Sequence, residues 1–191
     1  MKRRAMSRGA RYAGGAALLV LAYLVAFTTP GTALVEGSIV TTGHIGEQAI
    51  TRSIAATVHD AQLAEQVDFD FWIGTTSGIW FVADATIVAT TSRRGVEADV
   101  FIDGVRYPST ERVDTDTVDG SVIDAGFPVT GPILVELPAD VLTFPGARSA
   151  VLRISPSGDS RLDGVIEVTI DLTTLEVESR LELEPRRDGL R

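Results

Sequence analysis

The sequence predicts an all-β protein, an antiparallel immunoglobulin-like β-sandwich preceded by one N-terminal transmembrane or signal helix. Two observations lead to this prediction. Beyond residue 50 the dominant pattern is an alternation of apolar and polar side chains with a period of two, which is typical of half-buried strands. The first thirty residues instead join five basic side chains to one uncharged apolar run. We therefore expect two parts of different kind in one chain.

The N-terminal part has the layout of an export segment. Residues 1–11 hold five basic side chains and no acid, and residues 12–27 are sixteen uncharged residues. Positive charge before an apolar run predicts a cytoplasmic N-terminus and an extracytoplasmic remainder. Sixteen helical residues span only about 24 Å, less than a bilayer core of about 30 Å. Two outcomes stay open: residues 12–30 anchor the protein in the cell membrane, or a signal is cleaved near Ala33 and the protein is secreted.

Length and composition predict one folded domain after this segment. The residues that remain suit a single hydrophobic core rather than two. Four segments are predicted: a basic cytoplasmic N-terminus (1–11), the anchor or signal segment (12–30), an extracytoplasmic β-sandwich (34–175) and an acidic, then basic, C-terminal tail (176–191). Leu175, Val177, Leu181 and Leu183 alternate with acids, so an edge strand is an open alternative for the part of the tail before Pro185.

Charge and cysteine content exclude several classes of function. Residues 1–30 carry +5, so the formal total of −9 leaves −14 on residues 31–191. Such a field repels nucleic-acid phosphates and anionic lipid headgroups, which argues against nucleic-acid binding and against a peripheral docking surface on the membrane. It favours cations or basic partners. The chain has no cysteine, which excludes disulfides, thiol nucleophiles and cysteine-ligated zinc or iron–sulfur centres. Glycine-rich phosphate loops are also absent, and no cofactor is expected.

Three segments show strand alternation most clearly. In residues 79–90 every odd position up to 89 is apolar, so we expect one face to meet a core and the other to be mostly wet. Residues 54–59 alternate in the same way. Residues 165–172 form a third strand. Its inward side chains are expected to be Ile166, Val168, Ile170 and Leu172.

Turn residues divide the remaining sequence into short strands. Asp103-Gly104 separates two apolar runs and predicts a two-residue turn that closes an antiparallel hairpin. Further short runs occur at residues 121–123, 133–137 and 150–155, separated by Gly and Pro. No segment has the length of a stable amphipathic helix, although residues 138–142 could form one turn. Seven or more short strands favour the immunoglobulin-like sandwich.

The order of these landmarks resembles small actinobacterial envelope proteins of unknown function that carry a telokin-like, immunoglobulin-type secreted domain. The resemblance covers roughly residues 35–172 and implies a fold and an extracytoplasmic location, with no active-site residue. Its landmarks are residues 78–82 (Gly-Ile-Trp-Phe-Val), 107–112 (Tyr-Pro-Ser-Thr-Glu-Arg), 125–131 (Ala-Gly-Phe-Pro-Val-Thr-Gly), 134–138 (Leu-Val-Glu-Leu-Pro) and 161–163 (Arg-Leu-Asp).

No catalytic residue and no established metal site are expected. Three carboxylates in one loop, Asp114, Asp116 and Asp119, are the weak candidates for a hard cation such as calcium, but their spacing departs from the EF-hand pattern. A polar turn with Asx-type hydrogen bonds is the favoured interpretation of this loop. His44 and His59 are the only histidines, and we expect solvent or hydrogen-bonding roles for both.

Aromatic side chains gather in the hairpin half of the domain. In residues 68–72, Asp-Phe-Asp-Phe-Trp, we expect a strand edge with Phe69 and Phe71 facing inward. Trp72 and Trp80 would form a patch for protein partners or sugars if both were exposed side by side.

The sequence thus favours a non-catalytic, membrane-anchored extracytoplasmic domain for protein recognition or support of an envelope complex. The expected partner is an envelope protein of unknown identity, with no nucleic acid, and the membrane is contacted through residues 12–30. Two alternatives stay open: a divalent-cation or small-ligand binding protein, and an extracytoplasmic hydrolase using His44 or His59.

Overall fold

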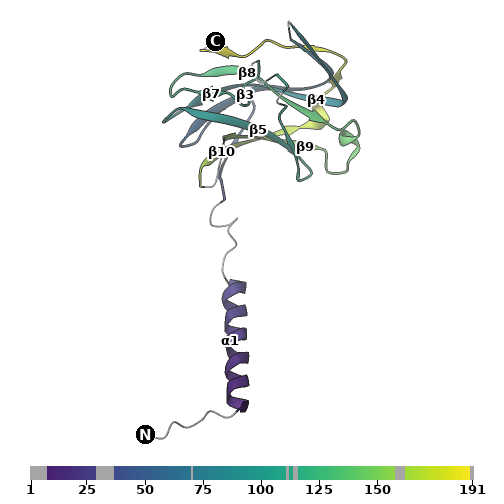
Figure 1. Ribbon diagram of the computed structural model, residues 1–191. Coiled ribbons are helices and arrows are strands. Elements are labelled where there is room, and N and C mark those ends of the chain that lie inside the picture. Colours follow the sequence, from purple (N-terminus) through teal and green to yellow (C-terminus); the bar gives the residue numbers. More distant parts are fainter. Residues whose placement is uncertain are drawn as a thin grey trace. The chain divides into compact units, whose positions relative to one another are not determined.

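The computed structural model describes residues 8–28, 37–69, 71–110, 112–113, 116–157 and 162–189. The chain divides into two compact units, Met1–Gly37 and Ser38–Arg191 (Figure 1). The first unit contains one helix, α1 (Arg8–Thr28). Within the described residues, no helix combines the length and the apolar character needed to cross a membrane. Membrane anchoring through residues 12–30 therefore stays a prediction.

The second unit is built from two sheets. One sheet has the strand order β1, β10, β9, β5, β6, with the short strand β7 also paired to β5. These strands are β1 (Ile39–Gly43), β10 (Gly164–Asp171), β9 (Ser149–Pro156), β5 (Arg94–Ile102), β6 (Val105–Pro108) and β7 (Val122–Ile123). We call it the first sheet.

The second sheet is centred on three long strands in the order β3, β4, β8. Short strands β2, β11 and β12 pair with β3, and β13 pairs with β8. Their bounds are β2 (Gln48–Ile50), β3 (Ile54–Phe69), β4 (Trp72–Ala89), β8 (Val129–Leu137), β11 (Val177–Glu178), β12 (Leu181–Glu182) and β13 (Arg187–Asp188), and two 3-10 turns, η1 (Val141–Thr143) and η2 (Leu172–Thr174), complete the unit.

The connections between the sheets confirm the immunoglobulin-like sandwich. Strands β3, β4 and β8 take the places of strands A, B and E, and β5, β9 and β10 take those of C, F and G. The principal pairs are antiparallel, but β1 pairs with β10 and both β11 and β12 pair with β3 in parallel. These parallel edge pairs were not predicted, because alternation within a strand carries no information about the direction of its neighbour.

The main core lies between the two sheets and follows the predicted alternation. The odd positions of β4 from Ile79 to Ala89 are buried in it. The predicted turn is also confirmed, because Asp103 and Gly104 have φ angles of 50° and 77°, as a two-residue hairpin loop requires. The inward side chains of the last long strand are confirmed as well, and they are Ile166, Val168, Ile170 and Leu172.

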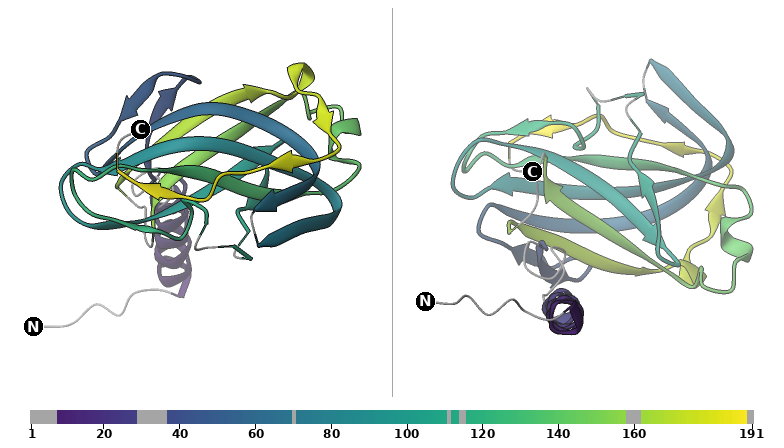
Figure 2. Two further views of the ribbon diagram at one scale, coloured as in Figure 1. Left: turned by 90° about the horizontal axis from the view of Figure 1, so that it is seen from above. Right: turned by 60° about the horizontal axis from the view of Figure 1, so that its bottom comes forward.

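The C-terminal segment differs from the expected tail. Residues 177–189, which we call the C-terminal strap, pair with β3 through β11 and β12 and then with β8 through β13. The strap thereby crosses the second sheet from one edge to the other, as the yellow ribbon shows (Figure 2). At Gly131 it passes so close that an added β-carbon would lie 2.9 Å from the Cα atom of Arg186.

The strap creates a second, smaller core on the outer face of this sheet. Leu181 and Leu183 pack on a cluster of buried side chains that includes Trp80 and Val82. The even positions of β4 were expected to be mostly wet. That expectation is wrong at Trp80 and Val82, which are buried because the strap covers them. Asp84, further along the same face, is half-buried and so keeps partial contact with water.

The tip of the β3–β4 hairpin also differs from the expectation. Phe69 is buried as predicted, but Phe71 is fully exposed rather than inward. The strand alternation ends at Phe69 and starts again at Trp72, so Phe71 belongs to the turn and no longer follows the parity of the strand. Residues 60–67, which contain several helix formers, continue β3.

Candidate functional site

The structure gives the predicted acidic loop a structural role at Asp119. The Asp119 carboxylate accepts a hydrogen bond from the Ala98 backbone N–H at 2.5 Å and another from the Ser109 hydroxyl. Both carboxylate oxygens are therefore used to hold the loop against β5. Asp116 follows a turn in which its N–H donates to the Val113 carbonyl, and Asp114 lies outside the described residues. Among the described residues, no group of three metal-ligating side chains occurs.

Burial governs the ionisation of Asp119. Removal from water raises the pKa of its carboxyl above the ordinary value, and the hydrogen bonds from Ser109 and Ala98 oppose this shift. A carboxyl that is already hydrogen-bonded at both oxygens is a poor ligand for a hard cation. The geometry accordingly favours the polar-turn interpretation of this loop.

The two histidines lie on different elements and have different hydrogen-bond partners. His44 is exposed in the turn after β1, where its carbonyl accepts from the Glu47 N–H. His59 is exposed on the outer face of β3, with its Nε2 atom 2.8 Å from the Thr86 hydroxyl. Thr86 in turn contacts the Thr130 hydroxyl at 2.7 Å. The hydrogen-bond partner of His59 is thus a hydroxyl rather than the carboxylate that orients a catalytic imidazole.

The two tryptophans are adjacent but do not form an exposed pair. Their ring centroids are 6.1 Å apart in an edge-to-face arrangement. Trp80 is completely buried and its indole N–H donates to the Gly74 carbonyl at 3.1 Å, whereas Trp72 is half-buried. The condition for an exposed tryptophan patch is therefore not met. The pair instead fixes the base of the β3–β4 hairpin against the strap.

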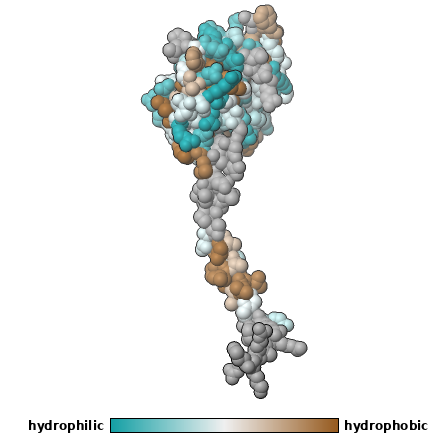
Figure 3. Space-filling model, turned by 60° about the vertical axis from the view of Figure 1, so that its left-hand side comes forward, coloured by the Kyte–Doolittle hydropathy of each residue, from teal (hydrophilic) through white to brown (hydrophobic). Residues whose placement is uncertain are grey.

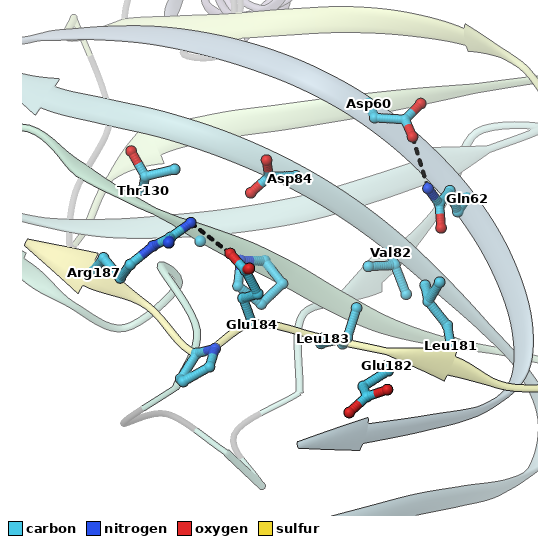
Figure 4. A pocket seen from close by; sticks show the side chains of 13 residues that line it. Asp60, Gln62, Val82, Asp84, Thr130, Leu181, Glu182, Leu183, Glu184 and Arg187 are labelled. Atoms are coloured by element: carbon cyan, nitrogen blue, oxygen red, sulfur yellow. Dashed lines mark hydrogen bonds and ion pairs between the residues drawn. The ribbon is translucent and has the colours of Figure 1, made fainter. Parts of the chain in front are cut away.

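A pocket lies between the strap and the outer face of the second sheet (Figure 4). Its volume is about 240 Å³. Asp60, Gln62, Val82 and Asp84 line the sheet side, and residues 181–185 and Arg187 form the opposite wall. Two of its polar contacts are internal, since Arg187 donates to Glu184 at 2.6 Å and Gln62 donates to Asp60 at 2.7 Å. The pocket is thus acidic at its rim and apolar at Leu181 and Val82.

The β3–β4 hairpin extends beyond the end of β8 and carries exposed apolar side chains. Strand β8 ends at Leu137, opposite Ile79, so the seven residues Trp72–Gly78 have no partner in β8. On the other side of the hairpin, β12 pairs with Val67 and Asp68 of β3, so the strap accompanies the hairpin almost to its tip. Phe71 at its tip is fully exposed and Ile73 is 64% exposed. We call residues 64–78 the hairpin arm.

The sequence contained a usable indication of this arm that was missed. Apolar alternation runs up to Phe69 and resumes at Trp72, and only two residues separate the two strands. A two-residue break between long strands is the usual length of a hairpin loop. Placing the turn there would have put Phe71 at an exposed tip instead of in a core.

The fold and these surfaces define an acidic immunoglobulin-like β-sandwich domain that follows an N-terminal helix. No known protein family matches the chain, and no curated protein matches it in sequence. Among solved structures, an uncharacterised β-sandwich protein from Clostridium difficile 630 is 14% identical, with a TM-score of 0.43 over 75% of this chain and 100% of that one. A secreted protein from Mycobacterium tuberculosis is 21% identical, with a TM-score of 0.40 over 66% of this chain and 96% of that one. Both similarities are distant, and no property of either protein is transferred from them.

Proposed function

We propose that this protein is a non-catalytic recognition domain outside the cytoplasm, held at the membrane by its N-terminal segment, and that the hairpin arm binds a partner protein of the cell envelope. The single observation that carries the proposal is the fully exposed Phe71 at the tip of the arm. A large aromatic ring in water gains free energy when a partner covers it, and such rings dominate the binding energy of many interfaces.

Contacts at the base of the hairpin arm hold the arm, and with it the Phe71 ring, in a fixed position. Trp72 packs edge-on to Trp80, and the buried Asp68 carboxylate pairs with Arg180 of the strap and accepts from Gln66 at 2.8 Å. An ordered arm loses little conformational entropy on binding. An exposed acidic side chain, Glu65, lies on the β3 strand of the arm, and the domain as a whole is acidic. A partner with an apolar socket and a basic rim is the best complement.

Export and anchoring are supported by the N-terminal sequence. Five basic residues precede the uncharged run, and α1 covers Arg8–Thr28. If the segment is instead cleaved near Ala33, recognition by the arm is unchanged, but the protein acts as a secreted domain. Fractionation of native membranes with an epitope tag at the C-terminus distinguishes the two, since a cleaved protein is shorter and washes off with carbonate.

Site-specific crosslinking tests the recognition proposal. A photoreactive amino acid replaces Phe71 in the full-length protein, and a second variant carries it at Val105, which is 51% exposed on a different hairpin. We expect one partner to be crosslinked reproducibly from position 71 and not from position 105. The double substitution Phe71→Ala/Ile73→Ala should reduce recovery of that partner at least tenfold, equivalent to about 1.4 kcal/mol. Equal crosslinking from both positions, or undiminished recovery with the double variant, would refute the proposal.

The pocket beneath the strap supports a second candidate function, the binding of a small cationic ligand. Its rim includes Asp60, Asp84 and Glu184, and its volume of about 240 Å³ suits a small amine. Calorimetry with calcium and with spermidine tests it. Heat of binding that disappears in Glu184→Gln would support this function, and no heat at millimolar ligand would remove it.

A further inference from the structure

One end of the sandwich differs from the rest of the acidic domain in both charge and polarity. We call it the proximal end, because the chain enters the domain there at Ser38. It comprises residues 51–53, 90–94 and 124–128, together with Leu162 and Asp163. The described residues of these loops contain three arginines, Arg52, Arg93 and Arg94, and two aspartates, Asp124 and Asp163, a net charge of +1. Arg94 is ion-paired with Asp163 at 3.7 Å, and Arg93 with Asp124 at 3.6 Å in a solvent-exposed pair of the kind that contributes little free energy and can exchange partners. In contrast, residues 31–191 as a whole carry a formal charge of −14.

Hydrogen bonds join these loops into one surface. The Ser53 hydroxyl donates to the Asp163 carboxylate at 2.7 Å, and the Thr90 N–H donates to the Ser53 carbonyl at 3.0 Å. The Gly126 N–H donates to the Ala89 carbonyl at 2.9 Å, which brings the third loop alongside. The surface is therefore fixed by the fold, although its parts come from distant positions in the sequence.

Large apolar side chains are exposed on this surface. Ile39, Ile50 and Leu162 line a common groove together with Arg52, and they are 63%, 60% and 61% exposed. Phe127, in the adjoining loop, is 69% exposed. In the space-filling view, apolar residues appear at the lower edge of the domain, next to hydrophilic and intermediate residues (Figure 3).

Leu162 shows that this exposure is built into the backbone. Its φ angle is +59°, in the left-handed region that bulky residues rarely adopt. The next residue holds it there, because Asp163 accepts from Ser53 and from the Gly164 N–H at 2.8 Å, and its carbonyl accepts from the Ile39 N–H at 2.8 Å. Backbone strain that turns a leucine toward water is a common mark of a functional contact.

We infer that the proximal end lies on the surface of an anionic lipid bilayer, with Ile50, Phe127 and Leu162 inserted among the headgroups and Arg52 and Arg93 paired with lipid phosphates. Proteins that bind at the membrane interface commonly insert large apolar side chains among the headgroups and place basic side chains beside the lipid phosphates. The inference rests on the proposed anchoring by the N-terminal segment. Only ten residues separate the end of α1 at Thr28 from Ile39, a reach of at most about 35 Å.

Charge reinforces the same orientation. An anionic leaflet attracts the proximal arginines and repels the remaining acidic surface. The hairpin arm starts from the opposite end of β3, since β3 runs from Ile54 at the proximal end to Phe69 at the tip. A bilayer at the proximal end would therefore leave Phe71 free for the proposed partner.

Single-cysteine labelling of the full-length protein tests the inference, because the chain has no native cysteine. Ile50→Cys and Phe127→Cys carry spin labels at the proximal end. Val105→Cys, also an exposed apolar position, is the matched control on another hairpin. The protein is reconstituted into vesicles of phosphatidylcholine with or without phosphatidylglycerol. Co-flotation reports anchoring, and collision of the label with oxygen or with a nickel chelate reports its depth.

With phosphatidylglycerol present, we expect the oxygen-to-nickel collision ratio to rise several-fold at positions 50 and 127 and to stay aqueous at position 105. Arg52→Gln/Arg93→Gln should remove most of the rise while the protein still floats with the vesicles. Protein that floats with aqueous labels at all three positions would overturn the membrane contact and leave the anchoring intact. Protein that does not float at all would overturn the anchoring and, with it, the contact.

Discussion

The indole of Trp72 lies directly over Gly74, so that a β-carbon at residue 74 would overlap the ring. The same glycine supplies the carbonyl that accepts the indole N–H of Trp80 at 3.1 Å. One residue without a side chain thereby positions both tryptophans of the chain. The edge-to-face pair that results closes the base of the hairpin arm.

Gly74→Ala should displace Trp72 and loosen the arm. The added methyl group needs the space of a packed ring, and overpacking of this kind costs about 1–3 kcal/mol of unfolding free energy. Denaturant unfolding measures the loss, and near-ultraviolet circular dichroism reports the weakened tryptophan pair. Ser77→Ala, an exposed position on the same strand, is the control and should stay within about 0.5 kcal/mol. An unchanged spectrum in Gly74→Ala would contradict the packing described for Trp72.

Removal of the two leucines of the C-terminal strap should uncover Trp80. Leu181 and Leu183 are the strap side chains that pack on the outer cluster, and both are half-buried. Leu181→Ala/Leu183→Ala should cost about 2–4 kcal/mol, because apolar area is lost on both sides of the contact. Tryptophan emission should shift to longer wavelength and become more accessible to acrylamide.

Glu182→Ala provides the control for the strap, because Glu182 lies between the two leucines and is exposed. It should leave both stability and emission unchanged. If the double leucine variant matched this control, the strap would be a peripheral tail, as its acidic sequence first indicated.

Local patterns in the sequence were sufficient for the sandwich but not for the strap. Alternation places Ile166 and Val168 in the core because strand parity is a local property, and Asp103-Gly104 defines its turn because the required φ angles are local too. The strap differs, because the burial of Trp80 depends on Leu181, about a hundred residues away in the sequence. The strap strands β11, β12 and β13 also have only two residues each, which is too few to show a period of two.

In the candidate site, too, the sequence shows which residues are present but not the contacts that the fold gives them. The acidic loop was visible in the sequence, but Asp119 is committed to Ala98 and Ser109, which only the fold brings near it. Phe71 and Leu162 owe their exposure to a turn and to a positive φ angle, respectively. Neither feature is encoded by hydrophobicity, which predicts burial for both side chains.

Asp119 should be required for the loop as a hydrogen-bond acceptor rather than as a charge. Asp119→Ala leaves the Ala98 N–H without its partner and should cost about 2 kcal/mol. Asp119→Asn keeps an acceptor for Ala98 and can donate to Ser109, so it should be much less destabilising. Calcium should shift the unfolding temperature of none of the three proteins. A calcium-dependent shift in the wild type that is lost in Asp119→Asn would restore the cation-site hypothesis.

The difference in stability between the wild type and Asp119→Asn should change with pH in a defined direction. The pKa of Asp119 is raised by burial, so the folded protein binds this proton more tightly than the unfolded chain. Its stabilising contribution is complete below the unfolded pKa of about 3.9 and is lost as pH rises through the raised folded value. Wild type and Asp119→Asn should therefore be closest in stability at low pH, and the variant should gain relative to the wild type above about pH 4.

Asp163 should show the opposite dependence. The Ser53 hydroxyl is the main cause of its lowered pKa, with the Gly164 N–H and Arg94 acting in the same direction and burial against them. Because the folded protein favours the ionised carboxylate, its contribution is present above the unfolded pKa of about 3.9 and is lost as pH falls through the lower folded value. Asp163→Ala should cost about 1–3 kcal/mol at pH 7, and this cost should shrink between about pH 4 and pH 2. Ser53→Ala, which removes only the main cause, should show a smaller loss with the same pH trend. A cost that stayed constant down to pH 2 would mean that the Asp163 carboxylate does not fasten the proximal loops, and the support for the backbone of Leu162 would have to come from elsewhere.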